Sequence, residues 1–242
     1  MKEERFFYTP DIENSDFLPQ DEAIHALRVL RLCVDDSIVL MDGKGVFYKA
    51  VITETSKKIC RFRVVDSIFN KKSWNTYIHI AVAPTKNIDR IEWFVEKAIE
   101  IGVDEISFIN TNFTERKRIN IERLEKIAIS AMKQSRKPFK TIINDLLDFS
   151  AFINNAKQEN KFICHCYNNE DLTDLKRKVF LKNVVGGLND ALVIIGPEGD
   201  FSVDEVLMAY HNDFMPVSLG ESRLRTETAA IVAVHIMNLF NS

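Results

Sequence analysis

The chain has 242 residues, of which 46% are hydrophobic and 28% are charged, and its 32 basic and 35 acidic residues leave a net charge of -3. This composition is that of a globular protein with one large or two smaller domains, and it argues against a uniformly basic nucleic-acid-binding surface. The 8 glycines form neither a G-x-G-x-x-G pattern nor a P-loop, which excludes the glycine-rich nucleotide sites of the Rossmann and Walker types.

The N-terminal part of the chain reads as β-rich with one short helix. The helix is expected over residues 21–32, with Asp21 as its N-cap. His25, Arg28 and Arg31 recur at intervals of three on the side opposite its apolar residues, which predicts a basic stripe. Three strands are expected, at residues 37–41, 46–52 and 59–65. A turn at residues 42–45 is expected to connect the first two.

The remainder of the chain alternates between strands and helices after a linker at 69–73. Gly102 predicts a helix end, and Ser202 with Glu205 predicts a capping box. Alternation of this kind favours a mostly parallel sheet, so we expect an α/β domain over 73–242 after a smaller domain over 1–72. The predicted strands are 77–83, 106–109, 161–166, 191–195 and 217–219, and the predicted helices are 88–102, 121–136, 202–209 and 228–240.

Basic residues are concentrated in two stretches of the sequence. Residues 114–140 contain nine basic and three acidic residues, and residues 56–72 contain six basic residues and one acidic residue. Local excesses of positive charge attract a phosphate backbone whatever the rest of the chain carries, although many charge runs are only solvated surfaces. An RNA partner is therefore one interpretation of these stretches.

The cysteines and the hydropathy pattern predict neither a metal site nor a membrane segment. The four cysteines match no zinc-binding spacing, and Cys164-His165-Cys166 lies in an apolar run without a second ligand pair, so core packing is expected there. No apolar run reaches about 18 residues, and the N-terminus carries no signal-peptide pattern. We expect a soluble, cytoplasmic protein with no metal.

Two of the predicted strands end in loops that combine glycine with charged residues. The strand at 191–195 runs into Gly-Pro-Glu-Gly-Asp-Phe, and the strand at 217–219 runs into residues 220–228. Ligands of parallel α/β sheets bind beyond the carboxyl ends of the strands, which makes these loops the candidate site; a strand-ending turn and a tight bend are the simpler alternatives.

Charged residues in the second loop stand directly before an apolar helix, where they need partners or a ligand. One interpretation is a structural Arg225–Glu227 pair with Thr226 or Thr228 as the helix cap. The other is a helix N-terminus whose free N–H groups bind an anionic or polar ligand.

The two loops resemble the signature of a known family. Ile-Gly-Pro-Glu-Gly at 195–199 and Leu-Gly-x-x-x-Leu-Arg-Thr-Glu-Thr-Ala at 219–229 are similar to motifs of the RsmE family, SPOUT-class methyltransferases that methylate N3 of a uridine in 16S ribosomal RNA. The resemblance covers most of the chain, through the motifs that contain His25, Arg28 and Arg31, Asp42-Gly43, Lys97, Glu100 and Gly102, Glu115-Arg116 and Gln134-Ser135.

Three positions depart from the pattern of that family. Many members have a second glycine where Asp200 stands, and many have Arg-Ile where this chain has Ser222-Arg223. Two places after Gln134-Ser135, many members have an arginine, whereas this chain has Arg136 followed by Lys137.

The resemblance implies a small N-terminal PUA-like β-barrel that binds RNA and a C-terminal SPOUT domain with a trefoil knot. It also implies a homodimer with S-adenosylmethionine as cofactor. The implied cofactor pocket comprises Ile195, Gly196, Pro197, Glu198, Gly199, Leu219, Gly220, Leu224, Thr228 and Ala229. The implied RNA-binding residues are Arg5, His25, Arg28, Arg31, Arg116, Lys117 and Arg136.

The expected chemistry assigns catalytic roles to Arg225 and Glu227. Uracil N3 must lose its proton as it attacks the methyl group, and an arginine near the uracil carbonyls would stabilise the developing negative charge. Glu227 would accept the proton or orient Arg225. Two alternatives remain: a related SPOUT enzyme that acts on transfer RNA, and a non-catalytic RNA-binding factor in ribosome assembly.

Overall fold

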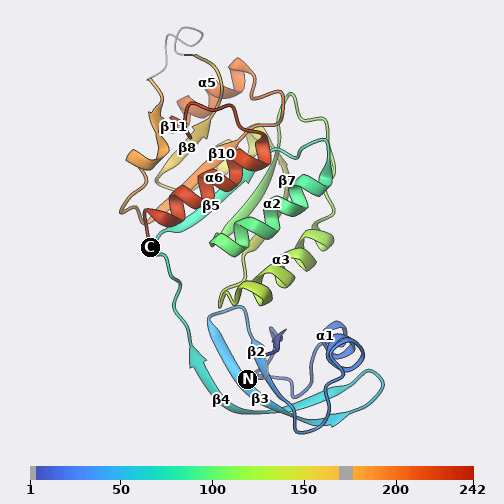
Figure 1. Cartoon of the computed structure of the whole chain (residues 1–242). Coiled ribbons are helices and arrows are strands. Elements are labelled where there is room, and N and C mark those ends of the chain that lie inside the picture. Colours follow the sequence, from blue (N-terminus) through green and yellow to red (C-terminus); the bar gives the residue numbers. More distant parts are fainter. Residues whose placement is uncertain (1–3, 169–176) are drawn as a thin grey trace. The chain divides into compact units, whose positions relative to one another are not determined.

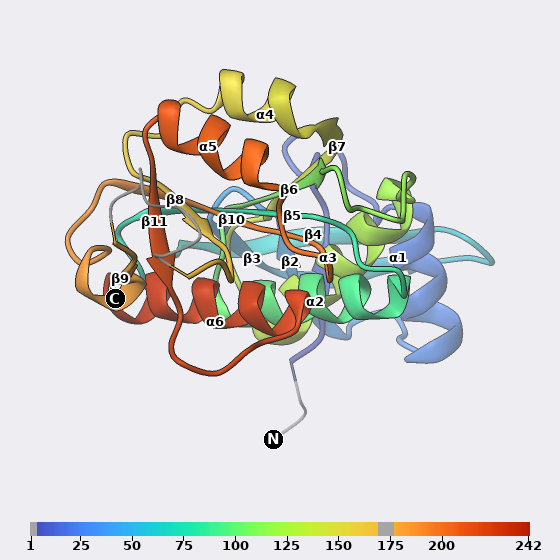
Figure 2. The same ribbon diagram turned by 90° about the horizontal axis from the view of Figure 1, so that it is seen from above.

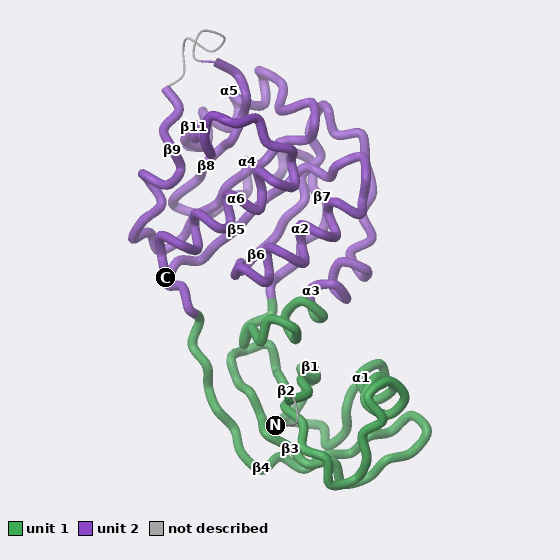
Figure 3. Tube along the Cα trace, in the orientation of Figure 1, with its two compact units in different colours: residues 1–72, 129–140 green, residues 73–128, 141–242 purple. Residues whose placement is uncertain are grey.

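The computed structural model describes residues 4–168 and 177–242, and the chain forms two compact units (Figure 3). Unit 1 comprises residues 1–72 and 129–140, and unit 2 comprises residues 73–128 and 141–242. The long stretch of basic residues at 114–140 is therefore divided between the two units.

Unit 1 is built on a four-stranded sheet in the order β1-β2-β3-β4 (Figure 1). The first pair is parallel and the other two are antiparallel. Asp16 and Leu18 extend the sheet beyond β4, through hydrogen bonds with Phe62 and Cys60. The strands are β1 (Phe6–Tyr8), β2 (Ser37–Met41), β3 (Val46–Thr55) and β4 (Cys60–Phe69). The sequence pattern missed β1, and Phe69, expected in the linker, ends β4.

The helix of unit 1 departs from the expected α-helix over 21–32. Helix α1 (Gln20–Ile24) continues as a π-helical segment, η1 (His25–Val29), in which the Leu30 N–H donates to the His25 carbonyl. The N-cap is Pro19 without a side-chain hydrogen bond, so the prediction of Asp21 as the cap was wrong. Arg31 lies beyond the helix with φ of 54°. Because a π-helix has more residues per turn than an α-helix, the predicted α-helical basic stripe does not form.

The turn between β2 and β3 packs against residues 136–140 within unit 1. The Asp42 Oδ1 atom accepts hydrogen bonds from the N–H groups of Lys44 and Val46, which confirms the predicted turn. The Gly45 N–H donates to the Pro138 carbonyl. A side chain at Gly45, which has φ of 113°, would place its Cβ 2.7 Å from the Phe139 ring. This close approach requires glycine.

Unit 2 is built on a seven-stranded sheet in the order β7-β6-β5-β10-β8-β11-β9. All neighbouring strands are parallel, which confirms the predicted mostly parallel sheet. The sequence analysis did not predict β7 or β9, and it placed the start of β11 at residue 217, three residues after its observed start at Phe214. The strands are β5 (Tyr77–Val82), β6 (Glu105–Asn110), β7 (Ile142–Asp148), β8 (Lys161–Cys164), β9 (Val179–Phe180), β10 (Asp190–Ile195) and β11 (Phe214–Ser218).

Helices cover both faces of this sheet. Helices α2 and α6 lie on one face, and α4 and α5 lie on the other (Figures 1 and 2). Gly102 ends α2 with φ of 125°, and Ser202 and Glu205 form the predicted capping box of α5. The helices are α2 (Ile88–Ile101), α3 (Ile121–Ser135), α4 (Phe149–Asn155), α5 (Val203–His211) and α6 (Thr226–Leu239), with a 3₁₀ turn, η2, at Leu181–Asn183. None of the helices in the described part of the chain has the length and apolarity needed to cross a membrane.

The central strands of unit 2 are buried, and their register positions the candidate site. Strands β5 and β10 are almost entirely apolar because both faces of the sheet are covered. Cys164, the last residue of β8, pairs with Ile195 on β10 and with Val217 on β11. The carboxyl ends of these three strands therefore meet at one edge of the sheet.

Candidate active site

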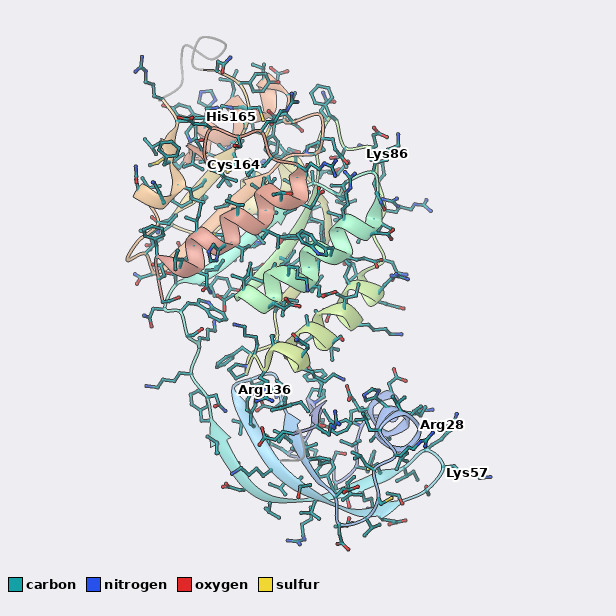
Figure 4. The ribbon with its side chains drawn as sticks, viewed as in Figure 1. Arg28, Lys57, Lys86, Arg136, Cys164 and His165 are labelled. Atoms are coloured by element: carbon teal, nitrogen blue, oxygen red, sulfur yellow. The ribbon has the colours of Figure 1, made fainter. Side chains whose placement is uncertain are left out.

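Three loops meet at the carboxyl edge of β10, β8 and β11. They are residues 165–168 after β8, residues 196–202 after β10 and residues 219–225 after β11. Figure 4 labels Cys164 and His165 where β8 ends. The sequence analysis identified the second and third loops as the candidate site, but it assigned the first to core packing because only its apolar character was visible.

Side-chain hydrogen bonds connect these three loops. The Thr226 Oγ1 atom donates to the Gly196 carbonyl at 3.0 Å, so the loops after β10 and β11, which contain the expected cofactor residues, are held together. The Tyr167 hydroxyl donates to the Phe201 carbonyl at 2.8 Å and connects the loops after β8 and β10. Helix α6 begins at Thr226 with Arg225 as an N-cap that makes no side-chain capping bond. The expectation that Thr226 or Thr228 caps this helix was therefore wrong.

Asp200 takes the backbone conformation of the glycine that it replaces. Its φ is 65°, in the left-handed region that glycine adopts freely and aspartate tolerates better than most residues. Its Oδ2 atom accepts a hydrogen bond from the Cys166 N–H at 2.7 Å, and its Oδ1 atom accepts one from the Phe201 N–H at 2.8 Å. At this departure from the family pattern, Asp200 thus has a backbone conformation open to glycine, and its side chain connects the loop to the loop after β8.

Gly220 provides open space in the third loop. It has φ of 139°, and a Cβ built at this position meets no atom within 4 Å. The neighbouring Arg223 and Arg225 side chains are exposed. Among the described residues, the Arg225 guanidinium has no hydrogen-bond or ion-pair partner, so it is available to a ligand.

Glu227 is a buried carboxylate at the start of α6. It is only 6% exposed, and its Oε1 atom lies 3.7 Å from the Nε atom of Arg90 on α2. Its Oε2 atom is buried and has no hydrogen-bond partner in the described part of the chain. The expected alternative of an Arg225–Glu227 pair is replaced by an Arg90–Glu227 pair. Sequence reasoning missed Arg90 because it belongs to a helix far from Glu227 in the sequence.

His165 is the second residue with unpartnered polar atoms at this edge. Both of its ring nitrogens are buried and lack hydrogen-bond partners among the described residues. Burial, assisted by the positive charge of Lys178, lowers the pKa of His165 to about 4. The ring is therefore neutral at pH 7 and carries one donor and one acceptor nitrogen.

Unpartnered buried polar atoms of unit 2 are thus confined to this edge. In its described residues, buried side-chain nitrogen and oxygen atoms without a hydrogen-bond partner belong to His165 and Glu227 alone. Buried polar atoms normally find partners, and exceptions mark functional positions or an absent ligand. This edge therefore has the properties of a polar ligand-binding site.

Neither cysteine of the loop after β8 is suited to nucleophilic catalysis or metal binding. Burial raises the pKa of the Cys164 thiol to about 12 and also raises the pKa of the Cys166 thiol. Both therefore stay protonated at neutral pH. Across residues 4–168 and 177–242, no group of three or more His, Cys, Asp or Glu side chains is placed to hold a metal ion.

The loops after β5 and β6 border the same edge and contain two of the expected RNA-binding residues. The Lys86 N–H donates to Glu198 Oε1 at 3.2 Å. The Arg116 guanidinium donates to the carbonyls of Thr85 and Lys86, and the Lys117 ammonium donates to Asn110 Oδ1. Arg116 and Lys117 therefore also stabilise these loops internally.

The other expected RNA-binding residues lie in unit 1. His25, Arg28 and Arg31 are exposed, whereas Arg5 is half-buried. The exposed Arg136 guanidinium lies over the Phe6 ring at 5.1 Å, and burial lowers the pKa of the neighbouring Lys137. Of the Arg136–Lys137 pair, Arg136 is thus the side chain presented to solvent. Figure 4 labels Arg28 and Arg136 in this unit.

Comparison with known proteins identifies the family of the chain. Residues 72–238 match a family described as an RNA methyltransferase domain, and residues 18–65 match an RNA methyltransferase PUA domain. The ribosomal RNA small subunit methyltransferase E of Buchnera aphidicola is 30% identical, with 93% of this chain and 87% of the relative covered. The chain belongs to the ribosomal RNA small subunit methyltransferase E family.

Two solved structures extend this similarity to the fold of the methyltransferase E family. A Porphyromonas gingivalis protein described as a probable rRNA-methyltransferase is 44% identical and has a TM-score of 0.89, with 98% of each chain covered. A Legionella pneumophila methyltransferase, solved with its bound cofactor SAM, is 26% identical with a TM-score of 0.84 and the same coverage. The fold of this chain is therefore shared with these two proteins over nearly its whole length.

Proposed function

We propose that this chain transfers a methyl group from S-adenosylmethionine to N3 of a uridine in 16S ribosomal RNA. The observation that carries the proposal is that buried polar atoms without a partner among the described residues occur both at His165, directly after β8, and at Glu227, at the start of α6, beside three loops that hydrogen bonds connect. Membership of the methyltransferase E family and the SAM-bound Legionella relative supply the identity of the ligand and of the RNA.

The loops fit a cofactor with polar and apolar parts. The open space at Gly220 admits a bound group, and the neutral His165 ring offers both a donor and an acceptor to it. We assign the pocket to residues of the loops after β10 and β11: Ile195, Gly196, Pro197, Glu198, Gly199, Leu219, Gly220, Leu224, Thr228 and Ala229. The bound cofactor supplies a methyl group already activated on a sulfonium, so the reaction as proposed uses no metal.

The protein contributes positioning and the handling of one proton. The exposed Arg225 guanidinium is free to donate to a uracil carbonyl and to stabilise the negative charge that develops as N3 attacks. The free Oε2 atom of Glu227 is a hydrogen-bond acceptor for the N3 proton. Arg90 holds the other carboxylate oxygen, so we assign it as a positioning residue for Glu227.

We assign a PUA-like domain to residues 1–72 and a methyltransferase domain to residues 73–242. Basic residues of both domains are assigned to RNA binding. The residues are Arg5, His25, Arg28, Arg31, Arg116, Lys117 and Arg136. Arg28→Glu combined with Arg31→Glu is expected to weaken binding to small ribosomal subunits while leaving cofactor affinity unchanged, because phosphate contacts position the RNA. Equal loss of both affinities in titrations would contradict these assignments.

A trefoil knot at the carboxyl edge and a homodimer complete the proposal. The connections between the loops after β8, β10 and β11 support the knot. The homodimer is what the family resemblance implies, and the exposed Trp93 on α2 and Leu239 on α6 are candidates for the surface that a second copy would cover. Sedimentation of the chain is expected to give twice its mass of 27.9 kDa.

The decisive experiment is mass spectrometry of ribosomal and transfer RNA from cells with and without the gene. Loss of 3-methyluridine from 16S ribosomal RNA alone, with its restoration on isolated small subunits by the purified protein and S-adenosylmethionine, is the expected result. A methyl group lost from transfer RNA would instead identify the related tRNA enzyme. Failure to bind S-adenosylmethionine in calorimetry would favour the non-catalytic assembly factor.

A further inference from the structure

A basic hollow lies next to the candidate site in unit 2. It has a volume of about 420 Å³ and is lined by four basic residues and one acidic residue. They are Lys86, Glu115, Arg116, Lys117 and Arg118. Figure 4 shows Lys86 at the N-terminal end of α2. A concave surface of one sign of charge concentrates oppositely charged ligands.

The four basic side chains divide into two pairs by their contacts. Arg116 and Lys117 are committed to the backbone carbonyls of Thr85, Lys86 and Thr111 and to Asn110, so they form the frame of the hollow. In contrast, the Lys86 side chain is 77% exposed, and among the described residues its ammonium has a surface ion pair with Glu115 alone, at 3.1 Å. Exposed pairs of this kind are weak and readily exchanged for another anion.

Arg118 is the most available cation of the hollow. Its side chain is exposed, and within the described residues its guanidinium makes no hydrogen bond or ion pair. It also lines a second hollow of about 480 Å³, which it shares with Arg116. That second hollow contains Asp89 and Glu92, and Glu92 already binds Arg123. Because the second hollow contains two carboxylates, an anion is expected to bind in the basic hollow lined by Lys86 and Arg118 rather than in the second one.

The basic hollow is fixed to the candidate active site by hydrogen bonds. The Lys86 N–H donates to Glu198 in the loop after β10, and Arg116 holds the carbonyls of Thr85 and Lys86 from the other side. A phosphate bound at Lys86 would therefore have a defined position relative to the cofactor loop.

We propose that Lys86 and Arg118 add contacts to the phosphate backbone of the RNA strand beside the target nucleotide, while Arg116 and Lys117, besides the RNA binding assigned to them above, form the frame that positions these two side chains. The inference rests on the proposed function, because it specifies how the RNA of that reaction is held. Arginine and lysine are the side chains that contact phosphate in such interfaces, and each contact contributes a salt-dependent increment of affinity.

The test compares the full-length protein with Lys86→Ala combined with Arg118→Ala, using small ribosomal subunits from cells that lack the gene. We expect the Kd for subunits at about 0.1 M KCl to rise about tenfold, and the slope of log K against log salt to fall in magnitude by about 1.5 to 2. The affinity for S-adenosylmethionine is expected to stay unchanged, since neither side chain belongs to the cofactor pocket.

The matched control is Lys157→Ala combined with Lys182→Ala. Both lysines are exposed in the same unit, and they lie outside the three loops of the candidate site. This variant loses the same charge and is expected to bind subunits with less than a twofold change in Kd. Equal affinities and salt slopes for the two double variants would overturn the inference.

The variant Arg116→Ala tests the role of Arg116 in the frame separately from the phosphate contacts of Lys86 and Arg118. Because Arg116 holds the loop that meets Glu198, its removal is expected to weaken S-adenosylmethionine binding, whereas the Lys86 and Arg118 changes do not. Unchanged cofactor affinity in this variant would overturn the assignment of Arg116 to the frame. Absence of methyl transfer by the unaltered protein would instead contradict the proposed function itself, so the two failures are distinguishable.

Discussion

Two histidines of unit 2 whose ring nitrogens are buried have opposite surroundings. On β5, His79 has a partner for each ring nitrogen: Ser107 Oγ lies 2.8 Å from Nε2, and Gln158 Nε2 lies 3.1 Å from Nδ1. After β8, both ring nitrogens of His165 are unpartnered among the described residues. Burial lowers the pKa of both residues to about 4. The two sites differ in hydrogen bonding rather than in charge.

The surroundings of His79 form a completed network. The Tyr77 hydroxyl and the Asn144 amide both donate to Glu105, and the Asn144 amide also donates to Ser107. Burial and the Glu105 carboxylate raise the pKa of Tyr77. A fully satisfied buried network rigidifies a fold, whereas unsatisfied groups at a sheet edge are available to a ligand. The comparison thus separates a structural polar cluster from a functional one.

The largest expected effect comes from Arg225→Ala at the functional edge. The variant is expected to fold and to bind S-adenosylmethionine normally, but to lose about 10² to 10³-fold in kcat, because one preorganised donor to the developing negative charge is removed. Single-turnover methylation of small ribosomal subunits measures this loss. Arg223→Ala removes the same charge from the same loop and is the control, with an expected loss of less than tenfold. Equal activity of the two variants would remove Arg225 from the mechanism.

A pair of leucine substitutions tests the contrast between the histidines directly. His79→Leu removes the partner of Gln158 and one of the two partners of Ser107, so we expect the free energy of unfolding to fall by about 2–4 kcal/mol with little change in cofactor affinity. His165→Leu removes nitrogens that have no partner in the described part of the chain, so stability is expected to stay within about 1 kcal/mol while cofactor affinity falls. Urea unfolding and calorimetry give the two readouts. A larger loss of stability in His165→Leu and a larger loss of cofactor affinity in His79→Leu would contradict the structural role of His79 and the ligand-binding role of His165.

The pH dependence of stability provides an independent measure of His79. Its pKa falls from 6.5, the ordinary value, to about 4 in the folded protein, so the folded state favours the neutral ring. This stabilisation is fully present above about pH 6.5 and is lost as the pH falls towards 4. Between pH 7 and pH 5, this linkage lowers the free energy of unfolding by about 2 kcal/mol. Urea titrations of His79→Leu are expected to lack this component, and an unchanged pH dependence would contradict it.

The smallest expected effect concerns the Arg90–Glu227 pair. Arg90→Ala frees Glu227 from its position and is expected to lower kcat about tenfold, with a smaller change in the KM for RNA. Arg90→Lys keeps the positive charge and is expected to recover part of the activity. A purely structural role for Arg90 would lower the melting temperature in both variants without this recovery of kcat.

Sequence reasoning was most successful where local chemistry decides the structure. The turn at Asp42, the end of α2 at Gly102 and the capping box at Ser202 were predicted because each depends on residues within a few positions of one another. The loops after β10 and β11 were also identified, since glycine and charge at strand ends are visible in sequence.

The elements that were missed depend on tertiary contacts. Strand β7 contains Asn144 and Asp145, which interrupt any apolar alternation, and it is held by pairing along β6. Strand β11 includes Pro216, which a sequence pattern excludes from a strand. The Arg90–Glu227 pair arises from packing between distant segments, as does the burial of the His165 ring nitrogens, which have no hydrogen-bond partner among the described residues. Local patterns contain no signal for such contacts.

Asp200 carries a consequence for how this family is found in sequences. Asp200 stands where the resembling motif has a second glycine, and it adopts a left-handed backbone with both carboxylate oxygens accepting hydrogen bonds. A search that demands the letters Pro-Glu-Gly-Gly would pass over this chain, although its loop has the required shape. The motif is better defined as a conformation, open to any residue whose side chain can compensate for the strain.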